Sequence, residues 1–509
     1  MVGLTQGLGV FLVNNNYPAI QGALGATSAE GGWLTTAYFA TSLSCAVILT
    51  KMRLQYGLRR FAEWGIFVYL LVSVINLVVR DLQSALVARA ALGLAATPLI
   101  TLSLLYMLEA FPKRFAPYGI TLGFAALQFG SPLARIISES LLEHASWRGL
   151  QLFDLAMACA CLAAINAVRL TPPPLMKVFN KGDALSFSLY ATALALLCVV
   201  FTQGRVAWWT DAPWIGGCLA AGIGLLGIFV MIELRRERPL IDLRWVCTPP
   251  VMTLAITIIL FRLVLSEQPF GVVTMMYSLG ITNDQMHGLF WWVTFGTAAG
   301  FLLSLLAIPW LKFRYPALVS LLFIFAAAWM DTQSTAQTRP EDLYLSQTLL
   351  AIGTSMFLMS ALLTGFIPVI LDGMRNVISF FAVFAVCNQM GSLMGSAALT
   401  TLLAERQSHH FAALSQWLRL SDPQVAARVA QGGGAYAGTL VDSAQRSGAG
   451  LATLMQQTSR EALIRAYNDV FFLIAALAVC TFIYLLVVTV RFEVKGAKAA
   501  TPAPQAPNT

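Results

Sequence analysis

Long apolar runs dominate the chain, and short polar connections separate them. About fourteen of these runs approach the ~20 residues that a helix needs to cross a bilayer. The pattern therefore predicts an all-α membrane protein with fourteen transmembrane helices. The expected spans are 2–21, 33–50, 61–79, 83–110, 116–142, 150–168, 185–202, 213–233, 252–278, 287–310, 315–331, 344–370, 377–403 and 470–491.

The spacing of the runs divides the chain into six spans, two spans and six more. We expect an amino-terminal six-helix bundle at 1–170, a linker with two extra helices at 171–249, and a second six-helix bundle at 250–491. The second bundle includes a long polar outer segment at 404–469, which is either a partly disordered loop or a small helical cap. The Pro/Ala-rich tail at 492–509 is predicted to be disordered. A duplicated six-helix unit is typical of transporters, whose substrate site lies between the halves.

Lys and Arg residues are concentrated in every second connection between the runs. Basic loops stay in the cytoplasm, so this bias sets the orientation and places both termini inside. The position of Met1, almost inside the first run, leaves open a start codon further upstream. The basic connections contain Lys51, Arg53, Arg59 and Arg60; Lys113 and Arg114; Arg169, Lys177 and Lys181; Arg235, Arg236, Arg238 and Arg244; Lys312 and Arg314; Arg375; and Lys495 and Lys498.

Composition narrows the function classes. Only 11% of the residues are charged and 58% are hydrophobic, whereas soluble domains carry about 25% charged residues. The net charge of +8 reflects this loop bias and attraction to anionic lipid headgroups, so we expect no nucleic-acid partner. The sequence has no phosphate-binding GxxxxGK[ST] motif, dinucleotide motif or metal-ligand pattern. We therefore expect a protein that is not an enzyme, with no metal or cofactor, driven by an ion gradient.

Charged residues inside the predicted spans are the strongest functional candidates, because an unpaired charge at bilayer depth costs at least about 2.5–3.5 kcal/mol. Two interpretations are open. The charges are structural ion pairs, or the carboxylates bind protons outside and release them inside. In the second case Glu267, then Asp154 and Glu139, couple protons, and three arginines position charge. The arginines are Arg89, Arg135 and Arg262.

Spacing gives some of these charges expected partners. Arg135 and Glu139 lie at i, i+4 and share a helix face. We expect them to form one cluster with Asp154 between the fifth and sixth spans. Arg262 and Glu267 are five residues apart and point in different directions, so each needs a partner on another helix.

Uncharged polar residues suggest where a substrate binds. Asn14 and Asn15 interrupt the first span, and Asn388 and Gln389 lie in the thirteenth. Trp292 is either an interfacial anchor or part of the cavity wall. These five residues are the predicted substrate-cavity set.

Several stretches resemble the major facilitator superfamily, and specifically its EmrB/QacA-type fourteen-span drug:proton antiporters. "VNNNYPAIQGALG" is similar to the first-helix motif, "LVARAALGLAATPLITLS" to the fourth-helix RxxqGxg motif with Arg89 and Gly93 matching, and "QMGSLMGSAAL" to the thirteenth-helix motif. The first-helix acidic residue of the family falls at Gly9 here. In the fifth helix, Arg135 and Glu139 replace small residues of the antiporter motif.

The resemblance implies a major facilitator fold in a bacterial inner membrane. It implies proton-coupled export of amphipathic small molecules, together with a HlyD-like periplasmic adaptor and an outer-membrane channel. The 404–469 segment is then the expected docking surface. Two alternatives stay open: a transporter of one specific metabolite or siderophore, and a sensor or scaffold that kept the fold but lost transport.

Overall fold

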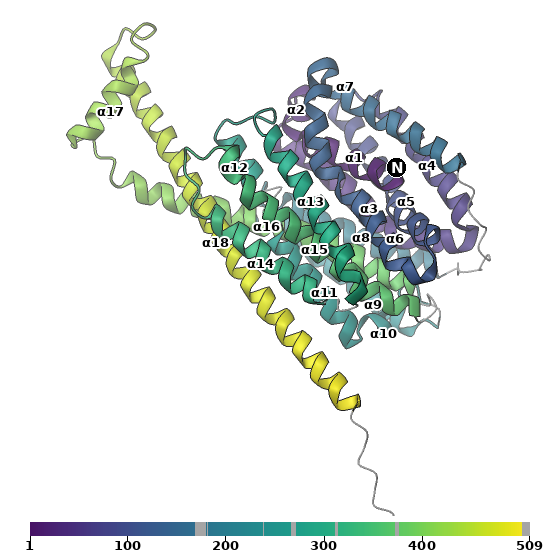
Figure 1. Ribbon diagram of the computed structural model, residues 1–509. Coiled ribbons are helices and arrows are strands. Elements are labelled where there is room, and N and C mark those ends of the chain that lie inside the picture. Colours follow the sequence, from purple (N-terminus) through teal and green to yellow (C-terminus); the bar gives the residue numbers. More distant parts are fainter. Residues whose placement is uncertain are drawn as a thin grey trace, which may run out of the picture.

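The protein is built of helices throughout the part of the chain that the structure describes. The computed structural model describes residues 1–167, 180, 182–237, 239–265, 271–310, 314–371 and 376–500. Figure 1 shows the amino-terminal helices on one side of the bundle and the carboxyl-terminal helices on the other, with one projection leaving the bundle at one end. We call this projection, residues 404–469, the tower.

The amino-terminal half begins with an interrupted helix. The first predicted span is split at Asn15 and Asn16, whose short amide side chains bond to backbone carbonyls and so compete with the helix. Asn16 Nδ2 donates to Leu12 O at 2.8 Å and Asn15 Nδ2 to Ser131 O at 3.0 Å. The helices of this half are α1 (Val2–Asn14), α2 (Tyr17–Ala23), α3 (Ser28–Tyr56), α4 (Leu58–Asn76), α5 (Leu82–Ala110), α6 (Ala116–Gln128) and α7 (Gly130–Ala167).

Two local signals set the limits of α3. Thr27 and Glu30 form a capping box at its start, in which each side chain bonds to the backbone N–H of the other residue. Gly57 alone joins α3 to α4, with a φ of 83°. That angle lies in the left-handed region, which glycine adopts without a steric penalty.

Helix α7 folds back on itself. Gly7 of α1 packs against Gly130, and Gly9, two residues further along, lies beside Asp154. A straight helix would separate residues 130 and 154 by about 36 Å at 1.5 Å per residue. The chain therefore reverses between the apolar segments Ala116–His144 and Trp147–Ala167, which correspond to the fifth and sixth predicted spans.

The two linker helices are α8 (Asp183–Gln203) and α9 (Pro213–Arg235), and α8 packs on α9, α3 and α16. Their ends opposite the tower carry a buried ion-pair network. Lys51 Nζ lies 2.8 Å from Asp183 Oδ2, and Arg236 bonds to Asp183 Oδ1 at 2.7 Å and to Glu233 Oε1 at 2.9 Å. These side chains are at most 15% exposed, so the network ties the linker to α3.

The core of the carboxyl-terminal half is continuous with buried residues of α5 and α6. Phe261 and Phe357 belong to this core, where their rings stack, and both are fully buried. The helices of this half are α10 (Leu243–Val246), α11 (Pro249–Val264), α12 (Val273–Ser278), α13 (His287–Ala307), α14 (Arg314–Asp331), α15 (Tyr344–Leu371), α16 (Val377–Ser415), α17 (Pro423–Gly434) and α18 (Ser443–Ala500).

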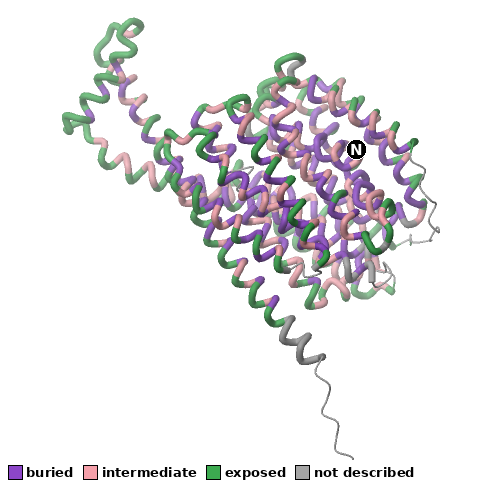
Figure 2. The backbone as a smooth tube through the Cα atoms, in the orientation of Figure 1, coloured by how far each residue is buried: buried purple, intermediate pink, exposed green. Residues whose placement is uncertain are grey.

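Membrane helices continue into the tower. Helix α16 runs to Ser415, and α18 begins at Ser443 and continues to Ala500, into the segment predicted to be a disordered tail. Val425 and Val429 of α17 pack on Leu454 of α18 in a small separate core. Figure 2 shows exposed residues over most of this projection and buried residues through the bundle.

Length and composition identify the spanning helices. Within the described residues, ten helical segments are long and apolar enough to cross a membrane, and α1, α11 and Tyr315–Asp331 of α14 are shorter apolar helices. Together with α4, they lie at the positions of the predicted runs. The prediction of an all-α membrane protein is confirmed.

Candidate functional site

A cavity of about 300 Å³ lies between the two halves, where a duplicated transporter holds its substrate. That volume suits a small organic molecule. Helices α1, α3, α5, α6 and α7 form one wall, and α11, α12, α13, α15 and α16 form the other. Aromatic rings and polar groups are mixed on its surface. The lining polar residues are Gln6, Asn15, Tyr38, Gln128, Ser131, Arg135, Arg262, Thr297, Thr354, Ser355, Asn388, Gln389 and Ser392.

Polar side chains of α11 and α16 meet on the carboxyl-terminal wall. Arg262 Nε donates to Asn388 Oδ1 at 2.5 Å. Gln389 Oε1 is buried and has no hydrogen-bond partner among the described residues. The Gln389 side chain lines the cavity.

Arg135 lies on the opposite wall, toward the tower end. Its guanidinium lies 5.0 Å from the centroid of the Phe290 ring. It donates to Tyr277 Oη and to Asn283 Oδ1, both at the long distance of 3.5 Å. Asn283 Nδ2 in turn donates to Asn16 Oδ1 at 3.3 Å. These polar contacts join the two halves at this end of the cavity.

The other end of the cavity is joined by apolar contacts. Phe124 of α6 meets Phe384 of α16 edge to face, with 6.2 Å between ring centroids. Leu104 and Ile120 belong to the same buried apolar cluster as Phe366 of α15. The two halves are thus held by polar side chains at the tower end and by packed rings at the opposite end.

The predicted cluster of Arg135, Glu139 and Asp154 is wrong. Glu139 Oε2 lies 3.3 Å from Nδ1 of His287 on α13. Arg135 faces the central cavity, and Asp154 faces a different pocket. The i, i+4 spacing placed Arg135 and Glu139 on one face, but that face packs on the carboxyl-terminal half, which supplies separate partners.

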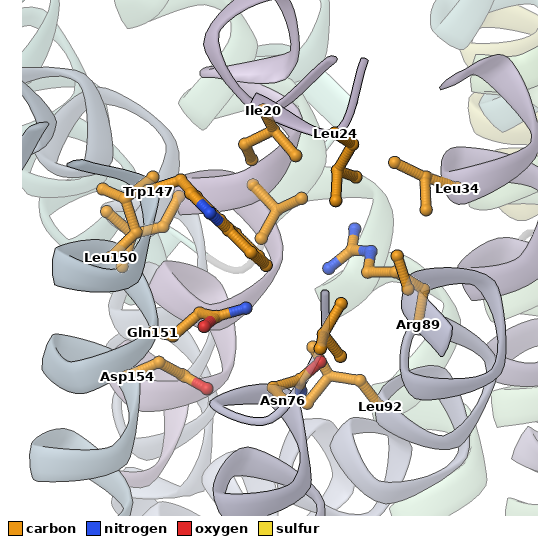
Figure 3. A pocket seen from close by; sticks show the side chains of 15 residues that line it. Ile20, Leu24, Leu34, Asn76, Arg89, Leu92, Trp147, Leu150, Gln151 and Asp154 are labelled. Atoms are coloured by element: carbon orange, nitrogen blue, oxygen red, sulfur yellow. The ribbon is translucent and has the colours of Figure 1, made fainter. Parts of the chain in front are cut away.

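A second, smaller pocket lies inside the amino-terminal half. It has a volume of about 40 Å³, room for a few water molecules but not for a drug-sized ligand. Figure 3 shows Arg89 pointing into it from one side and Trp147, Gln151 and Asp154 from the other. Asn76 of α4 also lines this pocket.

Asp154 is a buried carboxylate held by α4. Tyr69 Oη donates to Asp154 Oδ1 at 2.6 Å and Ser73 Oγ to Oδ2 at 3.0 Å. The carboxylate also lies against Gly9, where an added Cβ would be 2.8 Å from Asp154 Oδ1. Gly9 is where the family resemblance places an acidic residue. In this chain α7 therefore brings a carboxylate to the place where α1 lacks one.

Arg89 is also buried, with only 4% of its surface exposed. Its Nη2 donates to Asn14 Oδ1 at 2.9 Å, while Nε and Nη1 have no hydrogen-bond partner among the described residues. The guanidinium lies 4.9 Å from the centroid of the Tyr38 ring. Because Tyr38 also lines the central cavity, it forms part of the wall between the two sites.

The predicted site residues are distributed over both sites. Asn15, Arg135, Arg262, Asn388 and Gln389 line the central cavity. Asn14 is instead the partner of Arg89. Trp292 does not line the cavity: it is 47% exposed and stacks on Tyr344, because it lies on the outward face of α13. Glu267 lies outside the described residues.

Sequence reasoning missed the residues that support the charges. Tyr69 and Ser73 hold Asp154, Tyr38 contacts Arg89, and Tyr277 with Asn283 contacts Arg135. Tyr69 and Ser73 are polar and four residues apart in an apolar run, which places them on one face of a helix. That spacing was the signal from which the two hydrogen-bond donors to Asp154 could have been predicted.

A membrane bundle in two helical halves with a cavity between them defines the class as a secondary transporter. The sequence profile of the Major Facilitator Superfamily matches residues 1–404. The chain belongs to this family, whose members are transporters.

Individual relatives are distant. The chain is 21% identical over 425 residues to YhcA, an uncharacterized MFS-type transporter of Bacillus subtilis (strain 168). This match covers 81% of this chain and 76% of YhcA. It is 25% identical over 258 residues to the drug efflux pump JefA of Mycobacterium tuberculosis (strain CDC 1551 / Oshkosh). That match covers 48% of this chain and spans only 50% of JefA.

Solved structures share the fold. The crystal structure of an auto-inhibited POT family peptide transporter superimposes with a TM-score of 0.53, covering 100% of this chain and 98% of that protein. Sequence identity is 14%, so this likeness bears on the fold alone.

Proposed function

We propose that the protein is a proton-coupled exporter of amphipathic small molecules, of the fourteen-span EmrB/QacA type, in a bacterial inner membrane with both termini in the cytoplasm. The observation that carries this proposal is the separation of a water-sized pocket containing Asp154 and Arg89 from a cavity of about 300 Å³. The first volume suits protons and water, and the second suits an organic molecule. The name of JefA, a drug efflux pump, supports the direction of transport.

Asp154 is the proposed proton carrier. Burial at bilayer depth penalises its charged form, whereas the hydrogen bonds from Tyr69 and Ser73 stabilise that form. These opposing effects allow the carboxyl group to gain and lose a proton during the transport cycle.

Arg89 is the proposed link to the substrate. Its free nitrogens point into the pocket that Asp154 lines. When Asp154 is charged, attraction draws the guanidinium across the pocket and away from Tyr38. When Asp154 is protonated, the guanidinium rests on the Tyr38 ring, at 4.9 Å from its centroid. Proton binding thus changes the wall of the substrate cavity.

The proposal is tested with Asp154→Asn in proteoliposomes. We expect this variant to lose export driven by a pH gradient while keeping substrate exchange that needs no gradient. Asp211→Asn is the matched control, because Asp211 is exposed in the connection between α8 and α9. Gradient-driven export at the wild-type rate by Asp154→Asn would refute the role of Asp154.

Glu267 is the second proposed proton carrier, on sequence grounds alone. The same assay on Glu267→Gln separates the two carboxylates. If only Glu267→Gln abolishes gradient-driven export, coupling belongs to the carboxyl-terminal half.

We also propose that the tower docks a HlyD-like periplasmic adaptor that leads to an outer-membrane channel. Its base is fixed by Asp469, which bonds to Arg406 and His410 at 2.7 Å each. Its outer part exposes Trp417 (81%) and Val441 (94%). Exposed aromatic and aliphatic side chains of this kind serve as interface anchors.

A further inference from the structure

We infer that Asp154 exchanges its proton with the tower side of the membrane through the small pocket of the amino-terminal half, along water molecules that the Gln151 side chain positions. This inference rests on the proposed transport function and deepens it, because it gives the proton a route apart from the substrate cavity. It is carried by the order of side chains along the pocket, by the unpartnered polar atoms in its wall, and by the place of its mouth.

Side chains of one face of α7 line the pocket from its mouth to its base. Trp147, Gln151 and Asp154 are spaced at i, i+4 and i+7, which places them on one side of a helix. Trp147 is only half-buried, whereas Asp154 and, across the pocket, Arg89 are buried. The ring is therefore at the mouth, and the carboxylate lies about 10 Å deeper along the helix axis. Gln151 lies between them.

Polar atoms midway along the pocket have no partner in the protein. Gln151 Oε1, Arg89 Nε and Arg89 Nη1 are buried and without a hydrogen-bond partner among the described residues. Buried polar groups normally bond to protein or to ordered water. The pocket, at about 40 Å³, has room for about three water molecules at 10–15 Å³ each. Water bound to these atoms bridges the distance between the mouth and Asp154, and a water chain transfers protons.

The mouth of the pocket lies at the tower end of the bundle. Trp147 follows the reversal of α7, and Glu139, just before that reversal, lies 3.3 Å from His287 at the start of α13. The connection that leads into α13 contacts the tower, because Arg460 Nη2 of α18 donates to Leu279 O. Protons that enter beside Trp147 therefore come from the tower side, which is the outer side in the proposed orientation.

This route is separate from the substrate cavity. Among the described residues, none lines both spaces. Helix α1 contributes Leu12 and Val13 to the pocket and Val10 and Phe11 to the cavity. Variants can therefore obstruct one space and leave the other open.

The rate of proton uptake by Asp154 tests the role of Gln151. The protein is placed in liposomes with the tower outward, and the pH of the external medium is lowered rapidly. The infrared carbonyl band of the protonated carboxyl group, assigned by its loss in Asp154→Asn, reports the uptake. We expect Gln151→Met, which keeps the length of the side chain and removes its hydrogen bonds to water, to slow uptake severalfold. Gln83→Met, at an exposed glutamine of α5, is the matched control and should leave the rate unchanged.

Two variants at the mouth should act in opposite directions. Ala85 is buried and lines the pocket, so Ala85→Leu adds apolar atoms there and should slow proton uptake severalfold. Trp147→Ala widens the mouth and should speed uptake. Ser392→Phe fills the central cavity instead and should not slow it. If Ala85→Leu does not fold, Gln151→Met and Trp147→Ala decide, because neither enlarges a side chain.

The outcomes separate the route from the transport function. Wild-type uptake by Gln151→Met, slower uptake by Trp147→Ala, or slower uptake by Ser392→Phe would overturn the inference. If Asp154→Asn still loses gradient-driven export in that case, the transport function stands without this route. Slow uptake by Gln151→Met, combined with full gradient-driven export by Asp154→Asn, would confirm the route and refute the role of Asp154 in transport.

Discussion

The guanidinium of Arg89, which lines the water-sized pocket, lies 4.9 Å from the centroid of the Tyr38 ring, and Tyr38 lines the central cavity. A cation over an aromatic face is attracted to it without a hydrogen bond. The contact can therefore break and re-form at little cost when charge appears elsewhere in the pocket. Tyr38 is 2% exposed, so the ring has few alternative positions.

We predict that Tyr38→Ala uncouples the two sites. Without the ring, Arg89 no longer contacts the cavity wall. Substrate is then transported with fewer protons per molecule, because proton binding no longer changes that wall. The number of protons per substrate, measured by parallel flux of both in proteoliposomes, should fall severalfold. Tyr38→Phe keeps the aromatic face and should retain the wild-type ratio. A lowered ratio in Tyr38→Phe would assign the effect to the hydroxyl group instead.

We predict that Gly9 must stay small while Asp154 is present. A Cβ at this position would lie 2.8 Å from Asp154 Oδ1 and also against Tyr69 Oη. Overpacking of this kind typically costs about 1–3 kcal/mol. Gly9→Ala should lower the thermal midpoint and slow gradient-driven export. Gly22→Ala, where an added Cβ meets nothing within 4 Å, is the control.

The same contact gives a rescue experiment. Because Gly9 and Asp154 share one space, a carboxylate supplied from α1 can replace the one from α7. We predict that Gly9→Asp combined with Asp154→Ala, which vacates that space, regains part of the gradient-driven export that Asp154→Ala alone loses. If the double variant is as inactive as the single one while both bind substrate, the carboxylate must come from α7.

We predict that the network around Asp183 is a stability element. Asp183→Asn leaves buried Lys51 and Arg236 without their shared carboxylate, and breaking a buried pair costs about 3–5 kcal/mol. The thermal midpoint in detergent should fall by several degrees. The comparison is Glu63→Gln, which removes an exposed pair with Arg59, and such pairs contribute about 0–1 kcal/mol. Equal shifts in both variants would contradict the prediction.

We predict that the tower serves a partner and not transport itself. Replacing residues 412–458 with a short Gly/Ser linker should leave flux in proteoliposomes intact and abolish protection of cells and co-purification of the adaptor. Trp417→Ser is a milder variant that removes one exposed ring and should weaken the same two cellular readouts. Wild-type export by cells carrying the deletion would show that any partner docks elsewhere.

The apolar runs predicted the membrane helices well because bilayer thickness sets their length. The same reasoning ended the thirteenth span at 403, although α16 continues to Ser415. Hydropathy reports where a helix leaves the lipid and not where the helix ends. Helix α18 was misjudged for the same reason, since it runs from Ser443 through Ala500.

The charges were found from the sequence, but their partners were not. Asp154 bonds to Tyr69 and Ser73, which lie 85 and 81 residues away in the chain. Arg135 and Glu139 were expected to pair by spacing, yet each faces the carboxyl-terminal half. Such contacts depend on how helices pack, which the period of one helix does not specify.

The linker pair has unequal attachments to the two halves. It is joined to α3 by the buried ion pair of Lys51 and Asp183. In the described part of the chain it is joined to α16 by apolar packing and by neutral hydrogen bonds, from Trp209 Nε1 to Thr401 and from Asp242 N to Ser379, at 2.8 Å each. The contact between the linker pair and α16 is the weaker one, so we expect it to break first when the halves rotate. We therefore expect the moving bodies to contain eight and six helices, with spin-label distances between α8 and α3 constant and those between α8 and α16 changing through the cycle. The two extra helices then enlarge one rocking body and are not a passive tether between two equal ones.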